Sequence, residues 1–191
     1  MTLNLINGHE HPELIAELFS EYTALLIRLM PHFGESLALQ NYSEEFAHPE
    51  GKYAPPDGRL YIAMADGKPA GCIAMRKLDD ERCELKRMYV RPEFRGHHIA
   101  RTMAQRILSD AAEIGYQRVM LDTEPCLENA IRLYESLGFS RVARYNNSPF
   151  DSTIFMQYEL QKKRTPKKNE LYCAQMNHRE EERYDRTRDY H

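Results

Sequence analysis

One stretch of the sequence, residues 89–101, combines residue types and spacing that could bind a charged ligand. A predicted strand stops before Pro92, a short loop holds Arg95 and Gly96, and a predicted helix begins at Ile99. No Ser, Thr, Asp or Asn stands at the start of that helix to accept hydrogen bonds from its first free N–H groups. Free donors, the partial positive charge of a helix N-terminus and nearby arginines favour a phosphate or pyrophosphate ligand. The alternative is a helix end capped by water.

A strand, a crossover helix and a second strand must hold this loop in place. The helix is predicted from apolar residues at steps of four and three, namely Ile99, Met103, Ile107, Ala111 and Ile114, with Gly115 as its C-cap. The strand before the loop covers residues 83–90, and alternation puts Cys83, Leu85 and Tyr89 on one face and Met88 and Val90 on the other. The strand after the helix covers residues 118–121. Because parallel strands need such a crossover, the unit predicts one parallel pair.

The rest of the pattern predicts antiparallel strands with helices around them. An amphipathic helix is expected over residues 13–30, with Leu14, Leu18, Tyr22, Leu25 and Leu29 on its apolar face. The dipeptide Asp66-Gly67 supplies the positive φ of a tight hairpin turn. The other predicted elements are a short helix near residues 43–46 that ends in a loop over 49–58, strands at 60–65 and 70–76, a helix at 128–137, and strands at 142–145 and 153–160.

Composition narrows the class of protein. The chain has 191 residues with 42% hydrophobic and 29% charged side chains, and its net charge is −3. This balance argues against a nucleic-acid partner and against a polybasic membrane binder. No apolar run reaches the length of a membrane span, and the polar N-terminus lacks a signal-peptide core. We therefore expect a soluble, cytoplasmic protein, and we expect its four widely spaced cysteines to be reduced thiols without a metal.

The last 31 residues differ in composition from the rest of the chain. Residues 161–191 carry nine basic and six acidic side chains and few large apolar ones. They cannot bury enough surface to offset the cost of ordering the backbone. The sequence therefore predicts one domain at residues 1–160 and a charged, disordered tail at 161–191. The basic run at 162–168 is either simply solvated or a patch for an anionic surface.

The loop and its flanks resemble the GNAT superfamily of N-acetyltransferases. Residues 95–100, Arg-Gly-His-His-Ile-Ala, occupy the six places of that family's acetyl-CoA loop, Arg/Gln-x-x-Gly-x-Gly/Ala, and His98 replaces the first motif glycine. Further similarity lies in Glu84-Leu85, Tyr89-Val90-Arg91-Pro92, Asn129-Ala130, Leu133-Tyr134 and Gly138-Phe139. The resemblance covers about residues 60–160. It implies an α/β fold with a mixed, mostly antiparallel sheet, a central splayed parallel pair, and helices on both faces.

The resemblance implies acetyl-CoA as co-substrate and no metal. The implied cofactor-binding residues are Met88, Tyr89, Val90, Arg95, Gly96, His97, His98, Ile99, Ala100, Arg101, Asn129 and Tyr134. Backbone groups near Met88 and Val90 would bind the pantetheine arm, and the N–H of Tyr89 or Val90 would stabilise the oxyanion. His98 adds bulk where the family has glycine, yet its imidazole could project away or donate to a phosphate oxygen. His97 fills a variable place and could be solvated, and Asn129 could be a plain helix cap.

Two residues resemble the family's catalytic groups. Glu84 stands where similar enzymes place a general base or a water-holding carboxylate, and the alternative is a strand carboxylate paired with a cation. Tyr134 resembles the tyrosine that lies by the CoA sulfur as general acid, and the alternative is a core tyrosine. The resemblance implies direct attack of the amine in a ternary complex. Cys126 has no histidine partner nearby in sequence, so we discount a covalent acetyl-enzyme.

The acceptor is the part that the sequence leaves open. We expect a small-molecule or peptide amine, and we leave a homodimer open. Glu44, Glu45, Glu50 and Asp57 hint at a cationic acceptor, although loop carboxylates are common. Two other functions stay open: a non-catalytic acetyl-CoA-binding or regulatory module, favoured by His98, and a nucleic-acid-associated acetyltransferase steered by the basic tail.

Overall fold

The computed structural model describes residues 1–30 and 49–161. In chain order the elements are β1 (Leu3–Asn7), the 3₁₀ helix η1 (Gly8–Glu10), α1 (Pro12–Leu29), α4 (Pro49–Tyr53), β2 (Arg59–Ala65), β3 (Lys68–Lys77), β4 (Arg82–Val90), η2 (Pro92–Phe94), α5 (Ile99–Ile114), β5 (Arg118–Thr123), α6 (Glu128–Leu137), β6 (Ser140–Val142) and β7 (Ile154–Glu159). Within the described residues the strands form one seven-stranded sheet in the order β1-β2-β3-β4-β5-β7-β6. The pair β4–β5 is parallel and the other neighbouring strands pair antiparallel. The predicted α/β class and the central parallel pair are confirmed.

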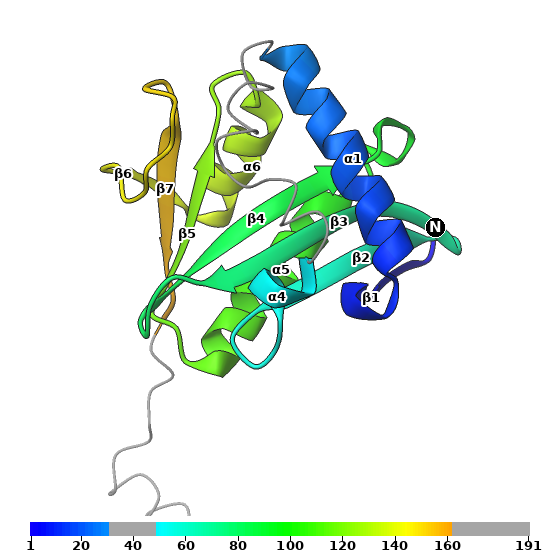
Figure 1. Ribbon diagram of the computed structural model, residues 1–191, viewed down its shortest axis with the longest axis horizontal. Coiled ribbons are helices and arrows are strands. Elements are labelled where there is room, and N and C mark those ends of the chain that lie inside the picture. Colours follow the sequence, from blue (N-terminus) through cyan, green and yellow to red (C-terminus); the bar gives the residue numbers. More distant parts are fainter. Residues whose placement is uncertain (31–48, 162–191) are drawn as a thin grey trace, which may run out of the picture. The chain divides into compact units, whose positions relative to one another are not determined.

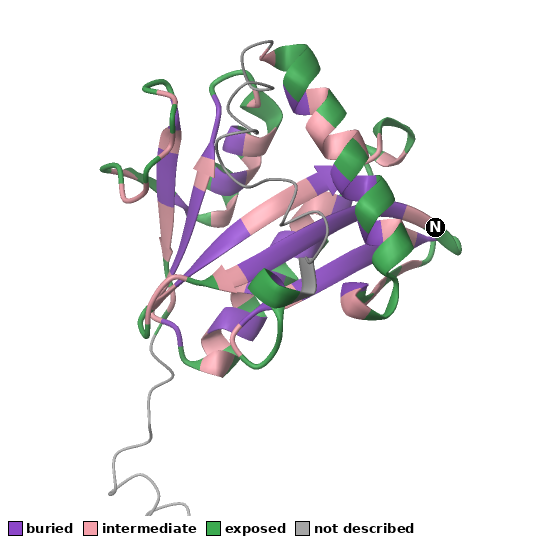
Figure 2. Cartoon of the chain, viewed as in Figure 1, coloured by how far each residue is buried: buried purple, intermediate pink, exposed green. Residues whose placement is uncertain are grey.

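Helices cover both faces of this sheet (Figure 1). α5 and α6 pack on one face, where Met103, Ile107 and Tyr134 join the larger core cluster. α1 and α4 pack on the opposite face, where Phe19 and Tyr53 join a second core cluster. The central strands lie between these layers and are buried along most of their length (Figure 2). The sheet is therefore packed on both faces, and β4 is its central strand.

A β-bulge in β4 changes which side chains face which helix layer. Cys72 of β3 pairs with Tyr89 and Ala74 pairs with Lys86, so two β4 residues stand opposite one residue of β3. Arg87 takes a positive φ of 56° at this point. The alternation predicted for β4 is therefore wrong beyond Lys86: Tyr89 joins the cluster under α1, whereas Met88 and Val90 pack on the α5 face together with Cys83 and Leu85.

β4 and β5 separate after three paired positions. Arg82, Cys83 and Glu84 pair with β5, and the rest of β4 has no partner there, although β5 continues to Thr123. The predicted splay of this parallel pair is thus present. It exposes one backbone edge of β4 from Leu85 onward.

Several sequence predictions need correction. Strand β1 was not predicted, because its five residues alternate too briefly to stand out from a polar N-terminus. Pro49 begins the short helix α4 rather than a loop, since proline is tolerated in the first helical turn. On α1 the buried side chains are those of Ile15, Leu18, Phe19 and Leu26. Of the predicted apolar face, Leu18 is buried, Leu14, Tyr22 and Leu25 are partly buried against the same cluster, and Leu29 is 41% exposed. The sixth strand lies at Ser140–Val142 rather than 142–145.

Other boundaries agree closely. α5 and α6 have the predicted ranges, and Gly115 and Gly138 end them with φ of 107° and 101°. Asp66 and Gly67 form the predicted hairpin turn with φ of 46° and 78°. The predicted helix near residues 43–46 and the predicted disordered tail, from residue 162 onward, lie outside the described residues.

Candidate active site

A cavity of about 1050 Å³ lies on both sides of the splayed end of β4. Its walls come from the last turns of α1, β4 from Leu85 to Val90, the loop before α5, the end of β5, α6 and the segment 146–150. Arg91, directly after β4, links that strand to α1, because its guanidinium donates to Glu21 and Glu17 of α1. It also donates to the carbonyl of Pro69 in β3. Of the predicted cofactor-binding residues, His97 is the one that does not line the cavity.

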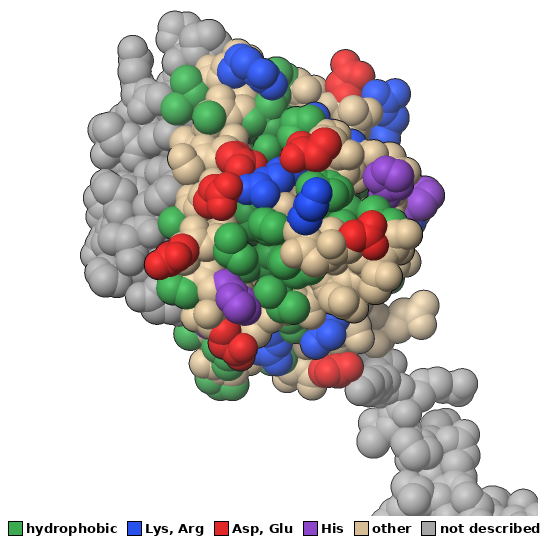
Figure 3. All heavy atoms as spheres, turned by 90° about the vertical axis from the view of Figure 1, so that its right-hand side faces the viewer, with side chains coloured by type: hydrophobic (Ala, Val, Ile, Leu, Met, Phe, Trp, Pro, Cys, Tyr) green, Lys and Arg blue, Asp and Glu red, His purple; other side chains and the backbone are tan. Residues whose placement is uncertain are grey.

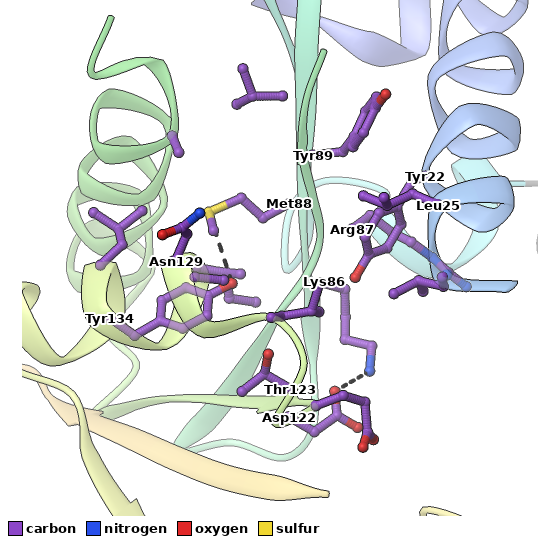
Figure 4. Close-up of a pocket in the computed structure, with 18 of the residues that line it drawn as sticks. Tyr22, Leu25, Lys86, Arg87, Met88, Tyr89, Asp122, Thr123, Asn129 and Tyr134 are labelled. Atoms are coloured by element: carbon purple, nitrogen blue, oxygen red, sulfur yellow. Dashed lines mark hydrogen bonds and ion pairs between the residues drawn. The ribbon is translucent and has the colours of Figure 1, made fainter. Parts of the chain in front are cut away.

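The side of the cavity that faces α5 and α6 carries Met88, Asn129 and Tyr134 (Figure 4). Tyr134 is buried, and its hydroxyl donates to the Met88 sulfur at 3.8 Å. Burial, with smaller contributions from Tyr22 and Asp122, raises the pKa of Tyr134. The phenol therefore keeps its proton at neutral and moderately alkaline pH. A protonated hydroxyl directed at a sulfur atom has the form that a general acid for a thiolate needs.

The loop before α5 presents backbone donors to the same cavity. Gly96 has φ of 83°, and His98, the N-cap of α5, takes the left-handed conformation with φ of 59°. The His98 side chain makes no capping hydrogen bond to the helix. Arg95 donates through Nε to the Val90 carbonyl at 3.1 Å, which ties the loop to the end of β4. The uncapped helix end predicted from the sequence is therefore present, and histidine fits the left-handed position that the family motif fills with glycine.

Glu84 is fully buried and does not line the cavity. Its carboxylate accepts a hydrogen bond from Arg76 Nε at 2.7 Å, forms an ion pair with Arg76 Nη2 at 2.6 Å, and accepts a hydrogen bond from the Tyr145 hydroxyl at 2.7 Å. Burial and the nearby Glu84 charge raise the pKa of Tyr145, so that phenol also stays protonated. Glu84 therefore ties β4 to β3 and to the segment after β6. The structure does not bring it together with Tyr134 on a common cavity wall.

The side of the cavity that faces α1 contains charged residues that sequence reasoning missed. Lys86 Nζ contacts Asp122 Oδ1 at 2.7 Å, and the Asn146 amide donates to Asp122 Oδ2 at 2.9 Å. Burial by itself would raise the pKa of Asp122, but Lys86 and Asn146 outweigh it and the pKa is lowered, so Asp122 is ionised at neutral pH. No local motif marks these residues, because they come from β4, β5 and a late loop and meet only in the folded chain.

The residues that the structure describes include no group of three or more His, Cys, Asp or Glu side chains placed to hold a metal ion. Within the same ranges, no helix is long and apolar enough to cross a membrane.

Comparison with known proteins decides the family. The model of the acetyltransferase (GNAT) family matches residues 20–139, which is more than half of the chain. The chain belongs to the GNAT family. An uncharacterised N-acetyltransferase of Schizosaccharomyces pombe is 34% identical over 144 residues, which cover 74% of this chain and 88% of that protein. Membership in the family makes the chain an acetyl-CoA-dependent acyltransferase.

A second curated relative and two solved structures are also similar to this chain. The N-acetylaspartate synthetase of Mus musculus is 40% identical over 86 residues, which cover 44% of this chain and 29% of that protein. A GNAT acetyltransferase of Staphylococcus aureus has the same fold, with a TM-score of 0.68 at 18% identity over 84% of this chain and 100% of that one. The PaiA N-acetyltransferase of Thermoplasma acidophilum, solved in complex with coenzyme A, gives 0.63 at 18% identity over 83% and 99% of the two chains.

Proposed function

We propose that this GNAT protein transfers the acetyl group of acetyl-CoA directly to a primary amine of a small molecule or peptide, with both substrates bound at once. The observation that carries the proposal is the cavity on both sides of the splayed strand β4. One side offers backbone and loop donors and a buried phenol, and the other side offers charged side chains. Two substrates can therefore approach the same strand from opposite sides.

The residues on the α5 side suit the chemistry of acetyl-CoA. β4 offers an unpaired backbone edge from Leu85 onward, which suits the amide groups of a pantetheine arm. The loop of Gly96 and His98 leads into the uncapped N-terminus of α5, where oriented N–H groups favour a pyrophosphate. Arg95 and Arg101 line the cavity beside it and add positive charge. Asn129, at the start of α6, lies across from Met88 in Figure 4, where it would contact the pantetheine arm.

The reaction needs one proton removed from the amine and one supplied to the leaving thiolate. Acetyl-CoA supplies the thioester carbonyl that the amine nitrogen attacks. A backbone N–H of Tyr89 or Val90 would stabilise the negative charge that develops on the carbonyl oxygen. Water in the cavity would take up the proton that the amine loses, Tyr134 would donate its phenolic proton to the thiolate as the carbon–sulfur bond breaks, and solvent would return a proton to Tyr134. The contact between the Tyr134 hydroxyl and the Met88 sulfur supports this role, because the donor already points at a sulfur atom.

For Glu84 the contacts favour a positioning role over the role of general base. A base must come within hydrogen-bond reach of the amine directly or through one water. The Glu84 carboxylate is instead enclosed by Arg76 and Tyr145, away from the cavity surface. We therefore propose that Glu84 holds Tyr145 and the following residue Asn146, which lines the cavity and donates to Asp122.

Two measurements on the intact chain test this function. Acetyl-CoA should raise the melting temperature, because it binds the folded chain and not the unfolded one. A panel of amines that includes free amino acids should then show release of CoA thiol, since the mouse relative is named for making an acetylated amino acid. A melting shift without thiol release on any amine would replace the enzyme with a binding module. If acetyl-CoA gave no melting shift and no amine gave thiol release, the proposed function would be contradicted.

A further inference from the structure

One buried carboxylate at the cavity, that of Glu124, has no cation beside it. Glu124 directly follows the last residue of β5, is 8% exposed and lines the cavity. It makes no ion pair with any residue in the described ranges 1–30 and 49–161. Acidic side chains on the outer face drawn in Figure 3 lie in open solvent, and several stand next to Lys or Arg. Glutamate is seldom buried without a paired cation, so its burial beside a cavity favours a role at that cavity.

Neutral hydroxyl groups hold this carboxylate in place instead. Thr153, the residue before β7, donates to Glu124 Oε1 at 2.7 Å, and the Ser152 hydroxyl donates to Oε2 at 3.1 Å. Because the Thr153 hydroxyl donates to the carboxylate, its oxygen accepts from the hydroxyl of Ser148, a cavity-lining residue, at 2.6 Å. These contacts fix the direction of the carboxylate without neutralising its charge. Each carboxylate oxygen also keeps a lone pair that can accept a further hydrogen bond.

The other carboxylates that line the cavity within the described residues have cationic partners. Asp122 pairs with Lys86 at 2.7 Å, and its lowered pKa makes it a weaker base. Glu128 pairs with Arg132 at 3.3 Å. Among these three cavity carboxylates, Glu124 is therefore the one whose charge is left for a ligand.

The acidic residues that hinted at a cationic acceptor do not share this position. Glu50 and Asp57 do not line the cavity. Glu44 and Glu45 lie outside the described residues. Glu124 was not singled out from the sequence, because no local pattern separates a loop carboxylate that folds inward from one that stays in solvent.

Glu124 begins close to the groups that would act on the thioester. It follows Thr123, which Figure 4 shows between Tyr134 and Asp122 at the end of β5. Consecutive Cα atoms are only about 3.8 Å apart. Burial raises the pKa of the nearby Cys126 thiol, and the charge of Glu124 adds to the increase. That thiol therefore stays protonated at neutral pH and does not compete with Glu124 for a proton.

We propose that Glu124 is the general base: through one water, it accepts a proton from the ammonium form of the acceptor before the nitrogen attacks the thioester. The inference rests on the proposed function and adds the residue that prepares the amine. An alkyl amine with a pKa of about 10.4 is almost entirely protonated at neutral pH, and its nitrogen has no lone pair until this proton leaves.

The remaining protons balance as the proposed function requires. The nitrogen loses a second proton to cavity water as the amide forms, and Tyr134 protonates the leaving thiolate. Protonated Glu124 returns its proton to solvent after the products leave. Each turnover of an ammonium substrate thus releases one proton, together with the acetylated amine and the CoA thiol.

A pH series on Glu124→Gln tests the proposal. The acceptor is whichever of L-aspartate, L-alaninamide and spermidine gives the highest kcat/KM with the unaltered chain, measured by release of CoA thiol. At pH 7 we expect turnover in Glu124→Gln to fall roughly 10²- to 10⁴-fold. The deficit should shrink as pH rises toward the pKa of the amine, because the amine then loses its proton without a base. Glu135→Gln is the matched control, since Glu135 is an exposed glutamate that does not line the cavity.

Two further measurements separate the loss of a base from a loss of structure. Acetyl-CoA should raise the melting temperature of Glu124→Gln as much as that of the unaltered chain, because the cofactor side is intact. Formate added to Glu124→Ala should restore part of the turnover, because a small carboxylate can enter the vacated space and accept the proton. A deficit that is independent of pH and that formate does not relieve would make Glu124 a positioning residue and overturn the proposal.

The hydroxyl that directs the carboxylate should give a smaller effect. Thr153→Val keeps the volume of the side chain and removes the donor to Glu124, so turnover should fall roughly tenfold, and Thr153→Ser should restore it. Equal turnover in Glu124→Gln and Glu135→Gln at pH 7 would overturn the proposal and leave the acetyltransferase function standing. No turnover by the unaltered chain with any amine would contradict the proposed function, and the inference with it.

Discussion

The two sides of β4 are built in different ways. On the α5 side the candidate site consists mainly of backbone: an unpaired strand edge, a glycine loop and the N-terminus of a helix. On the α1 side it consists of side chains from several separate segments, with ion pairs such as Lys86–Asp122 between them. Backbone groups are the same in every sequence, whereas side chains differ. The α5 side therefore suits an invariant co-substrate, and the α1 side suits recognition of a particular acceptor.

Tyr134→Phe is the strongest test of the α5 side. The ring stays packed against Phe139, 5.6 Å away, and only the proton donor is lost. We expect turnover to fall roughly 10²- to 10⁴-fold, the range for general acid catalysis, while acetyl-CoA still raises the melting temperature. Tyr158→Phe is the control, since Tyr158 also packs on Phe139 but does not line the cavity. Equal turnover in the two variants would remove Tyr134 from the mechanism.

Gly96→Val tests whether backbone conformation carries cofactor binding. A Cβ on Gly96 would meet no protein atom within 4 Å, so its cost comes from the positive φ of 83° and from the space it takes from the ligand. We expect acetyl-CoA affinity to fall by roughly 10- to 100-fold, about 1.4 to 2.7 kcal/mol. Gly67→Val shares both features, a φ of 78° and open space, but lies in the hairpin turn away from the cavity. At a fixed acetyl-CoA concentration the melting shift should shrink in the first variant and stay unchanged in the second.

Glu84→Gln separates positioning from proton transfer on the acceptor side. If Glu84 acts by holding Tyr145, the variant should lose turnover roughly tenfold, because small displacements of binding residues are costly, and the loss should not depend on pH. Tyr145→Phe removes the other end of the same 2.7 Å hydrogen bond and should give a similar, equally pH-independent loss. A deficit in Glu84→Gln that shrinks as pH rises toward the pKa of the amine would instead identify Glu84 as the base.

The contrast between the two sides also explains what the sequence could predict. The loop at 95–100 is contiguous, and its uncapped helix start and glycine are local signals, so the α5 side could be predicted residue by residue. The α1 side depends on Arg87, whose direction is set by a bulge that no local pattern marks. Asp122 and Asn146 likewise meet only because β5 and the segment after β6 lie beside β4. Tyr89 was placed on the wrong face for the same reason, since one extra residue in a strand reverses its alternation.

The smallest expected effects come from the two strained residues that mark the two sides, His98 with φ of 59° and Arg87 with φ of 56°. His98→Gly should relieve the left-handed backbone, and the added freedom of the unfolded chain should offset part of that gain, which leaves a net stabilisation of up to about 1 kcal/mol. For a chain of this size that corresponds to a rise in melting temperature of roughly 2–4 °C. Acceptor kinetics should not change, because His98 serves the loop through its backbone.

Arg87→Gly relieves a similar strain but also removes a guanidinium that lies over the Phe19 ring at 5.6 Å. That cation–π contact is worth about 0.5–1 kcal/mol, and its loss offsets part of the strain that glycine relieves. We expect the acceptor KM to rise, in contrast to His98→Gly, because the Arg87 side chain lies on the α1 side of the cavity, whereas His98 contributes its backbone to the loop before α5. Thermal melting and acceptor kinetics on the two variants measure this difference directly. A rise in acceptor KM for His98→Gly equal to that for Arg87→Gly would show that the two sides of β4 do not divide the work in this way.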